Sequence, residues 1–320
     1  PGGLFYCSKD VFESKKATVH METEVDGIDF DAKKVYATGK DGNKMEESYD
    51  KLILATGSLP ITPKVPGMDL ENVQFVKLFQ DAQKANAQLD SPEVKSVAVV
   101  GAGYIGVELA EAVQRRGKKS LLFEAEDTSL SSYYDPWFTQ DMDKVLADHG
   151  VELHFGQRVQ EIKGTNGKAS AIVTNKGEYP VDMVIMAIGF MPNTALGKGK
   201  LATIANGAYK VDLHQQTSLP DVYAIGDCAT VYSNALQDTA YIALATNAVR
   251  SGVVAAHNAS GTPLESVGVQ GSNGISIYGY NMVSTGLNMK AAKAAGFDPV
   301  YTQFEDLQKP AFIQNNQKVK

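Results

Sequence analysis

Three glycines with G-x-G-x-x-G spacing stand in the stretch VAVVGAGYIGVELA at residues 97–110. In such a stretch Gly101 permits a tight turn, Gly103 lets the backbone approach a pyrophosphate, and Gly106 lets a helix pack closely on a strand. The first amides of the following helix would face the phosphates, where the positive end of the helix dipole favours an anion. The spacing therefore predicts a turn that binds a dinucleotide.

The context of this motif makes the prediction more specific, because glycine turns alone occur in any α/β fold. The motif lies between a strand predicted at 96–100 and a helix predicted at 105–116, and Glu124 ends the next strand about twenty residues on. A carboxylate there accepts hydrogen bonds from the adenosine ribose and repels the 2′-phosphate of NADP, so NADH is the expected ligand. The alternative is a solvated acid at the strand end, since Glu126 and Asp127 follow closely.

Alternating strands and helices begin at about residue 94 and indicate a parallel sheet with crossover helices. We expect an α/β, Rossmann-like NAD(H)-binding domain with an antiparallel meander before its last strand. Its predicted elements are strands at 96–100, 120–124, 151–155 and 183–188, helices at 105–116 and 135–149, and the meander at 159–181.

Two further turns follow short apolar strands on either side of this unit. One is Ala55-Thr56-Gly57-Ser58, and the other is Ala224-Ile225-Gly226-Asp227. Each alone is unremarkable, but together they are typical of the second half of a flavin-binding domain, in which the carboxylate hydrogen-bonds the ribityl chain. Such a domain also needs a first G-x-G-x-x-G for the FAD pyrophosphate, and we expect that motif before residue 1.

The chain outside this unit forms three further segments. Before the dinucleotide unit we expect a helix at 9–16 and antiparallel strands at 18–25, 34–38 and 46–49. A strand at 52–57, a proline-rich linker and a helix at 79–89 follow them. A strand at 222–225, a long buried helix at 241–258 and strands at 274–278 and 283–285 follow the dinucleotide unit. We therefore divide the chain into 1–93 (partial FAD-binding domain), 94–205 (NAD(H)-binding Rossmann domain), 206–262 (second FAD-binding segment) and 263–320 (partial C-terminal dimerisation domain).

Composition argues against several other classes of protein. The formal net charge of −7 does not suggest the clustered basic surface that nucleic acids require. No apolar stretch approaches the roughly 18 residues of a membrane helix. Two cysteines make no disulfide framework and show no metal-ligand spacing, so we expect a cytoplasmic protein without a metal site.

The sequence resembles the pyridine nucleotide-disulfide oxidoreductase family, within it the NADH oxidase and NADH peroxidase branch of lactic-acid bacteria. The resemblance covers essentially the whole chain. It is most specific at GGLFY (2–6), GAGYIG (101–106), IGFMPN (188–193) and YIALATNAVR (241–250), and STGL (284–287) looks like the opening of the family's C-terminal dimerisation domain.

Carried over residue by residue, the resemblance implies that Tyr104 lies over the flavin and swings aside when nicotinamide enters. It also implies that Glu108 sits beside the nicotinamide and that Gly189 lets the backbone approach it. The alternatives are a core aromatic at a helix start for Tyr104 and a first-turn acid favoured by the dipole for Glu108.

The resemblance further implies that Tyr133 lies on the adenine side, with Tyr134 as the competing candidate, and that a helix start at 244–246 faces the flavin's pyrimidine ring, where its amides would stabilise negative charge. A purely structural helix start is the alternative. The expected cofactor-binding residues are Ala55, Thr56, Gly57, Gly101, Gly103, Tyr104, Ile105, Gly106, Glu108, Glu124, Ala125, Tyr133, Ile188, Gly189, Asp227, Leu244, Ala245 and Thr246.

The family's redox cysteine would lie upstream of Pro1, so we expect no catalytic residue in this chain. Cys7 and Cys228 are interpreted as bystander thiols, and the chain as part of a longer enzyme. The resemblance implies an FAD-dependent NADH oxidase that reduces O2 to water or H2O2, as a homodimer. NADH peroxidase and coenzyme A-disulfide reductase remain alternatives, as does a non-catalytic NAD(H)-binding fragment.

Overall fold

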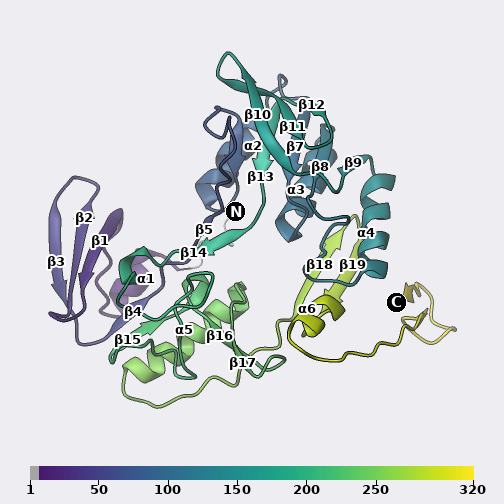
Figure 1. Cartoon of the computed structure of the whole chain (residues 1–320). Helices are drawn as coiled ribbons and strands as arrows, with labels where there is room; N and C mark the ends of the chain where they lie inside the picture. Colours follow the sequence, from purple (N-terminus) through teal and green to yellow (C-terminus); the bar gives the residue numbers. More distant parts are fainter. Residues whose placement is uncertain (1–6) are drawn as a thin grey trace. The chain divides into compact units, whose positions relative to one another are not determined.

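The computed structural model describes residues 7–320, so the predicted family stretch at 2–6 lies outside the described residues. The chain forms two compact units, each made from two separate segments. Unit 1 comprises Pro1–Leu59 and Phe190–Val269, and unit 2 comprises Pro60–Gly189 and Gln270–Lys320. Figure 1 shows the elements of both units along the chain.

Unit 2 is built on a five-stranded parallel sheet in the order β6-β13-β7-β8-β9. Its central strand is apolar on both faces because helices and the meander cover it, and Val97, Ala98 and Val99 are all fully buried. The strands are β6 (Val73–Phe75), β13 (Met183–Met186), β7 (Ser96–Val100), β8 (Lys119–Phe123) and β9 (Val151–His154), and the helices are α2 (Phe79–Leu89), α3 (Tyr104–Arg115) and α4 (Pro136–Asp148). The predicted α/β class is confirmed.

Strand β6 is the one member of this sheet that the sequence did not predict. It has only three residues and follows the proline-rich linker, so periodicity gives no signal for it. The predicted meander is present as an antiparallel sheet of β10 (Val159–Thr165), β11 (Lys168–Thr174) and β12 (Glu178–Pro180).

The end of the chain in unit 2 forms a hairpin that packs on the helices of the parallel sheet. Its strands are β18 (Asn273–Ile277) and β19 (Tyr280–Ser284), followed by the unpredicted helix α6 (Met289–Ala294) and the pair β20 (Asp306–Leu307) and β21 (Lys318–Val319). Ile277 and Met282 of the hairpin belong to the same buried cluster as Val99 and Met142. The hairpin is therefore part of the hydrophobic core beneath the dinucleotide motif.

Unit 1 contains an antiparallel sheet and a small parallel pair. The antiparallel sheet consists of β1 (Thr23–Asp29), β2 (Lys34–Gly39) and β3 (Lys44–Ser48), and β4 (Leu52–Leu54) pairs in parallel with β15 (Val222–Ala224). Its other elements are α1 (Lys9–Ser14), β5 (Ser58–Pro60), β14 (Phe190–Pro192), η2 (Ala195–Gly197), η3 (Gly226–Cys228), β16 (Val231–Ser233), β17 (Asp238–Ala240) and α5 (Ala245–Ala259).

The long helix of unit 1 differs from its prediction in two ways. Helix α5 begins at Ala245 and not at residue 241, because residues 241–244 form an irregular segment after the end of β17 at Ala240, and Leu244 is extended (φ −131°, ψ 140°). The helix is also buried on one face only, since Val254 is 8% exposed whereas Val249 is 65% exposed. Its Ala and Val content indicated burial, but composition alone does not show which face is covered. No helix of the described residues is long and apolar enough to cross a membrane.

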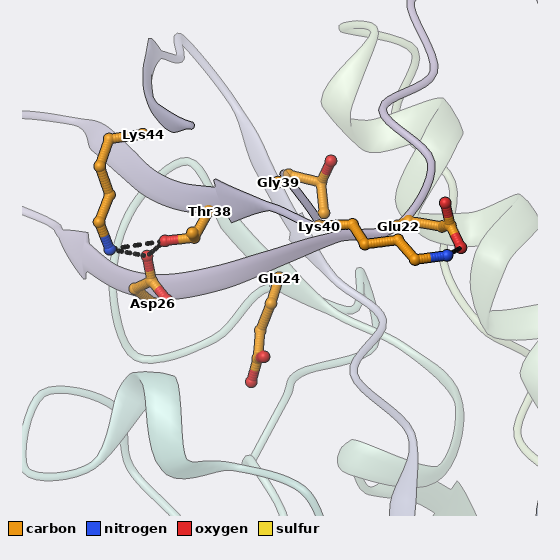
Figure 2. A pocket seen from close by; sticks show the side chains of 8 residues that line it. Glu22, Glu24, Asp26, Thr38, Gly39, Lys40 and Lys44 are labelled. Carbon is orange, nitrogen blue, oxygen red and sulfur yellow. Dashed lines mark hydrogen bonds and ion pairs between the residues drawn. The ribbon is translucent and has the colours of Figure 1, made fainter. Parts of the chain in front are cut away.

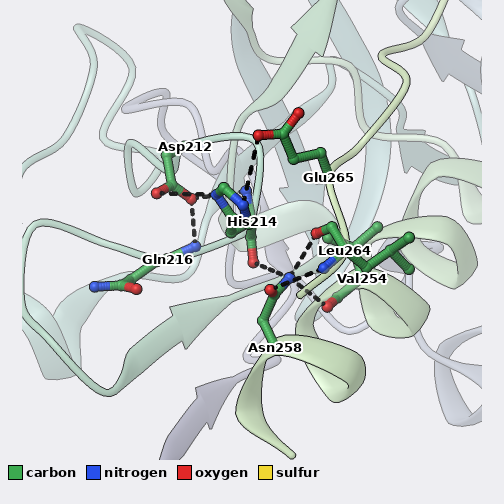
Figure 3. Close-up of polar contacts among 7 residues, drawn as sticks. All are labelled: Asp212, His214, Gln216, Val254, Asn258, Leu264 and Glu265. Atoms are coloured by element: carbon green, nitrogen blue, oxygen red, sulfur yellow. Dashed lines mark hydrogen bonds and ion pairs between the residues drawn. The ribbon is translucent and has the colours of Figure 1, made fainter. Parts of the chain in front are cut away.

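The last turn of α5 is tied to two loops by one amide side chain (Figure 3). Asn258 Nδ2 donates to the carbonyl oxygens of Leu264 (2.7 Å), Val254 (2.9 Å) and His214 (3.2 Å), and its Oδ1 accepts from the Leu264 amide (3.2 Å). The imidazole of His214 lies 3.8 Å from a carboxylate oxygen of Asp212 and 3.6 Å from one of Glu265. This cluster fixes the chain on either side of the helix end.

Candidate dinucleotide-binding site

The turn between β7 and α3 requires glycine at its first position. Gly101 has φ +100°, and a Cβ there would lie 2.5 Å from the carbonyl oxygen of Ala187. Its amide donates to the carbonyl of Phe123 at 2.7 Å. The backbone conformation and the adjoining strand β13 therefore both exclude a side chain at Gly101.

The second and third glycines differ in the space around them, which is open at Gly103 and filled at Gly106. Gly103 is the N-cap residue of α3, and a Cβ added to it would find no atom within 4 Å, so the backbone here can be approached from outside. Gly106 packs against the carbonyl oxygen of Gly101, so a larger residue would require the turn to move. No side chain caps the first amides of α3, which leaves them able to bind a phosphate.

Glu124 closes this turn from the neighbouring strand. Its Oε2 accepts from the Ala102 amide at 2.7 Å, and its Oε1 accepts from the amides of Ala125 (2.6 Å) and Glu126 (3.1 Å). The carboxylate is half-buried and held by backbone amides. It retains acceptor capacity, because two carboxylate oxygens offer about four lone-pair sites. Such a group fits the hydroxyls of a ribose.

Three tyrosines lie together at the start of α3. The rings of Tyr104 and Tyr133 have centroids 4.4 Å apart, and the hydroxyls of Tyr104 and Tyr134 are 2.8 Å apart. Tyr134 is 5% exposed and Tyr133 is 41% exposed, so only Tyr133 offers much of its ring to a ligand. Burial raises the pKa of Tyr104 above its ordinary value, and its contact with the Tyr134 hydroxyl acts in the same direction.

Further predicted residues lie on the same unit. Partial burial, aided by the charge of Glu111, raises the pKa of Glu108 on α3. Gly189 has φ +100°, and its carbonyl accepts from the Ile61 amide at 3.0 Å. Ile188 packs against the cluster on one face of the parallel sheet, Ile105 is half-buried on α3, and Ala125 is exposed.

In unit 1 the two predicted flavin-side turns come together through side chains. The Ser58 hydroxyl donates to Asp227 Oδ2 at 2.9 Å across 169 residues of sequence. Thr56 Oγ1 donates to the Asn193 carbonyl at 2.6 Å, and Gly57, with φ +68°, accepts from the Asn193 amide at 2.9 Å. The contact partners Ser58 and Asn193 were missed as site residues, because the pairing of β4 with β15 that places Ser58 near Asp227 cannot be read from either segment alone.

Near these turns lies a buried tyrosine hydroxyl that lacks a well-formed hydrogen bond. The Tyr241 hydroxyl is buried and makes no well-formed hydrogen bond among residues 7–320. Burial, followed by the charge of Asp227, raises the pKa of Tyr241 to about 12, while the nearby Ser58 hydroxyl opposes the shift. Ala245 and Thr246 are exposed at the start of α5, after the extended residue Leu244, and no side chain caps this helix. These features fit a polar group bound at the start of α5.

Neither cysteine has the surroundings of a metal ligand. Cys228 is buried, with its sulfur 3.2 Å from the Ile225 carbonyl and 3.5 Å from that of Leu54, whereas Cys7 is exposed. In the part of the chain that the structure describes, no three His, Cys, Asp or Glu side chains gather in a way that could hold a metal.

A hollow of about 630 Å³ lies on the antiparallel sheet of unit 1 (Figure 2). Four of the five charged residues around it are paired with one another: Lys40 contacts Glu22 at 2.5 Å, and Asp26 accepts from Thr38 and contacts Lys44 at 3.4 Å. None of the predicted cofactor-binding residues lines it.

The fold and the dinucleotide turn are those of a nucleotide-dependent oxidoreductase, and comparison with known proteins agrees. The family model described as pyridine nucleotide-disulphide oxidoreductase matches residues 8–252. The chain therefore belongs to the pyridine nucleotide-disulphide oxidoreductase family, which confirms the resemblance predicted from its motifs.

Individual relatives are similar over the whole chain. An NADH oxidase of Lactococcus lactis subsp. cremoris is 59% identical over 100% of this chain and 72% of its own length, and one of Streptococcus pyogenes is 56% identical over 98% and 71%. Among solved structures, a water-forming NADH oxidase from Lactobacillus brevis bound to NADH has a TM-score of 0.95 and 38% identity, covering 99% of this chain and 70% of that one.

Proposed function

We propose that this protein is an FAD-dependent NADH oxidase, which takes a hydride from NADH and reduces O2 to water or H2O2. The observation that carries the NADH half is the joining of the Gly101–Gly106 turn to Glu124 through the Ala102 amide. The naming of its relatives as NADH oxidases supports the reaction as a whole.

In this proposal each part of the turn has one task. The open backbone at Gly103 and the uncapped amides of α3 bind the pyrophosphate. Glu124 accepts hydrogen bonds from the adenosine ribose and disfavours a 2′-phosphate by charge repulsion. The exposed ring of Tyr133 covers the adenine side, and Gly189 allows the nicotinamide end to approach the backbone.

A second solved structure supports the role of the acid. It is an engineered water-forming NADPH oxidase bound to NADPH, 37% identical to this chain with a TM-score of 0.94. Its substitutions replace an aspartate by alanine, and the alanine directly after that aspartate by arginine. In this chain Glu124 is likewise followed by Ala125. A 2′-phosphate is repelled by a carboxylate and attracted by an arginine, so this pair of substitutions suits NADPH.

The flavin is assigned to unit 1. The turn at Thr56 and Gly57, the carboxylate of Asp227 and the amides of Ala245 and Thr246 would hold FAD, which when bound accepts the hydride and passes electrons to the oxidant. The amides at the start of α5 stabilise negative charge in a group bound against them. The Ser58 hydroxyl holds Asp227 in position for a ligand hydroxyl.

The oxidase proposal is tested by oxygen uptake. The purified protein is loaded with FAD, and oxygen consumption is recorded after addition of NADH, with catalase added at the end. We expect NADH-dependent oxygen uptake, and return of half the oxygen on catalase addition only if H2O2 is the product. The Gly103→Ala variant is the control, because we expect it to bind NADH about tenfold more weakly or worse while the fold is kept. NADH oxidation that needs added peroxide or coenzyme A disulfide would instead identify a peroxidase or a disulfide reductase.

A second candidate is an NAD(H)-binding protein without turnover, favoured by the placement of the G-x-G-x-x-G turn and its acid together in unit 2. It predicts NADH binding with no flavin absorption bands even after incubation with FAD. The domain limits, the homodimeric state and the cytoplasmic location remain proposals, and sedimentation measurements would test the dimer.

A further inference from the structure

The Tyr241 hydroxyl is a buried polar group that the fold of unit 1 leaves without a hydrogen bond. Tyr241 lies between the end of β17 at Ala240 and the start of α5 at Ala245, and its oxygen has no hydrogen-bond partner among residues 7–320. A buried hydroxyl without a partner costs free energy in the folded protein, because it has given up its hydrogen bonds to water. Such a group requires an explanation, and a ligand that accepts its proton supplies one.

The surroundings of this hydroxyl are those of the proposed flavin site. The charge of Asp227 acts on Tyr241, and the Ser58 hydroxyl lies close to it. Ser58 donates to Asp227 Oδ2 at 2.9 Å, and a serine hydroxyl has one proton, so Ser58 has none left to donate to Tyr241. The Gly226 amide, directly before Asp227, donates to Ser251 Oγ of α5 at 3.2 Å, which joins this turn to the helix. Tyr241 is therefore located beside the carboxylate that the proposed function assigns to FAD.

The chain on either side of Tyr241 is held in place. Ala240 is paired in the antiparallel contact of β17 with β16, and Asn247 Nδ2 donates to the Ile242 carbonyl at 3.1 Å. Asn247 belongs to the first turn of α5 and is only 5% exposed, so this bond is sheltered from water. The two contacts fix the backbone that carries Tyr241 before any ligand binds, which lowers the entropic cost of binding.

We propose that Tyr241 is a further FAD-binding residue: its hydroxyl donates a hydrogen bond to an acceptor atom in the flavin or ribityl part of the cofactor. Those parts carry oxygen and nitrogen acceptors, whereas the neighbouring carboxylate of Asp227 suits ligand hydroxyls that donate. The Tyr241 hydroxyl is closed to solvent in the free protein, so binding includes a small movement of the side chains around it. This inference rests on the proposed function, because it takes FAD as the ligand of unit 1.

The test follows from the hydrogen bond that the complex gains and the free protein lacks. Removing the hydroxyl should affect the two states in opposite directions. We expect Tyr241→Phe, freed of flavin, to melt at the same temperature as the wild-type protein or higher. Its FAD dissociation constant, measured by quenching of flavin fluorescence, should rise about five- to fiftyfold. A tyrosine with a purely structural role would show the reverse, with lower stability and unchanged affinity.

Two other tyrosines of unit 1 serve as matched controls. Tyr49→Phe also removes a buried hydroxyl without a hydrogen bond among residues 7–320, from the segment between β3 and β4. Tyr209→Phe removes a hydroxyl that accepts from the Gly197 amide at 2.9 Å and donates to the Thr194 carbonyl at 3.1 Å, so it should lower stability. Both control variants should bind FAD as the wild-type protein does.

The possible outcomes separate this inference from the proposed function. Wild-type FAD affinity in Tyr241→Phe, or a loss of stability in its flavin-free form like that of Tyr209→Phe, would overturn the inference and leave the proposed function intact. The same weakening of FAD binding in Tyr49→Phe would also overturn it, because the effect would then not be specific to Tyr241. A wild-type protein that binds no FAD would overturn the flavin half of the proposed function, and this inference with it.

Discussion

The dinucleotide turn of unit 2 and the flavin-side turns of unit 1 are both glycine turns at the ends of parallel strands, but they are built differently. The first is a continuous six-residue stretch whose geometry follows from local steric demands at Gly101, Gly103 and Gly106. The second joins Ser58 to Asp227 across 169 residues and depends on the pairing of β4 with β15.

The two regions also differ in how their polar groups are satisfied. Glu124 already accepts three backbone hydrogen bonds, whereas the Tyr241 hydroxyl is buried without a normal partner. The comparison indicates that the dinucleotide turn and its acid satisfy one another within residues 101–126, whereas a site assembled from distant segments depends on the packing around it and on what binds there.

The largest expected effect is that of Gly101→Ala. A Cβ at φ +100° and 2.5 Å from the Ala187 carbonyl adds backbone strain to steric overlap, so unfolding free energy should fall by about 2–4 kcal/mol in urea denaturation. The control is Gly42→Ala, where φ is also positive (+83°) but no atom lies within 4 Å of the added carbon. Equal losses in the two variants would show that the contact with Ala187 is unimportant.

The substitution Asn258→Ala should lower the stability of unit 1, because it removes the side chain that hydrogen-bonds two loops to the end of α5. The change leaves the carbonyls of Leu264 and His214 without their shared donor, and we expect a loss of about 1–3 kcal/mol in unfolding free energy. Asn281→Ala removes an exposed amide and should stay within about 0.5 kcal/mol of wild type. A stable Asn258→Ala variant would mean that unit 1 does not depend on this connection.

Gly103→Ala should separate binding from stability within the first region. Since Gly103 has ordinary φ (−74°) and open space beside it, unfolding free energy should change by less than about 1 kcal/mol. The added methyl group occupies the space through which the pyrophosphate approaches, so NADH affinity, measured by fluorescence titration, should fall about tenfold or more. Unchanged affinity would remove Gly103 from the site.

The smallest effect concerns acid stability in unit 1. Hydrogen bonds from Lys33 (2.8 Å) and Lys51 (2.5 Å) lower the pKa of Asp221 from 3.8 to about 2. The ionised carboxylate therefore contributes its full stabilisation above pH 3.8 and loses it as the pH falls towards about 2. The difference in Tm between wild type and Asp221→Asn should be constant above about pH 5 and shrink below pH 3.8. A difference that does not change with pH would contradict this assignment.

The sequence predicted most of the turns and strands that are formed by continuous stretches of the chain. The G-x-G-x-x-G turn, the strands around it and the meander were found because each has its own local pattern of glycines or apolar residues. Strand β6 is too short to show periodicity, and its place at the sheet edge depends on pairing with β13. The early start assigned to α5 was wrong because the apolar residues of 241–244 continue the pattern of the helix although they form an irregular segment before it.

The contacts that complete the sites were not predictable in the same way. Ser58 and Asn193 are ordinary polar residues in their own segments, and only tertiary structure brings them to Asp227 and Thr56. A polar residue at a strand end gives no signal of its distant partner, so such residues are found from structure and tested by substitution.

The account depends most on Glu124 and the turn that it closes. Calorimetric titration of the wild-type protein with NADH and with NADPH tests this directly, together with the variant Glu124→Gln. We expect wild type to bind NADH about tenfold more tightly or better, and Glu124→Gln to lose most of that preference, because the variant lacks the charge that repels the 2′-phosphate. Equal affinity of the wild-type protein for the two nucleotides, or no binding of either, would contradict the account.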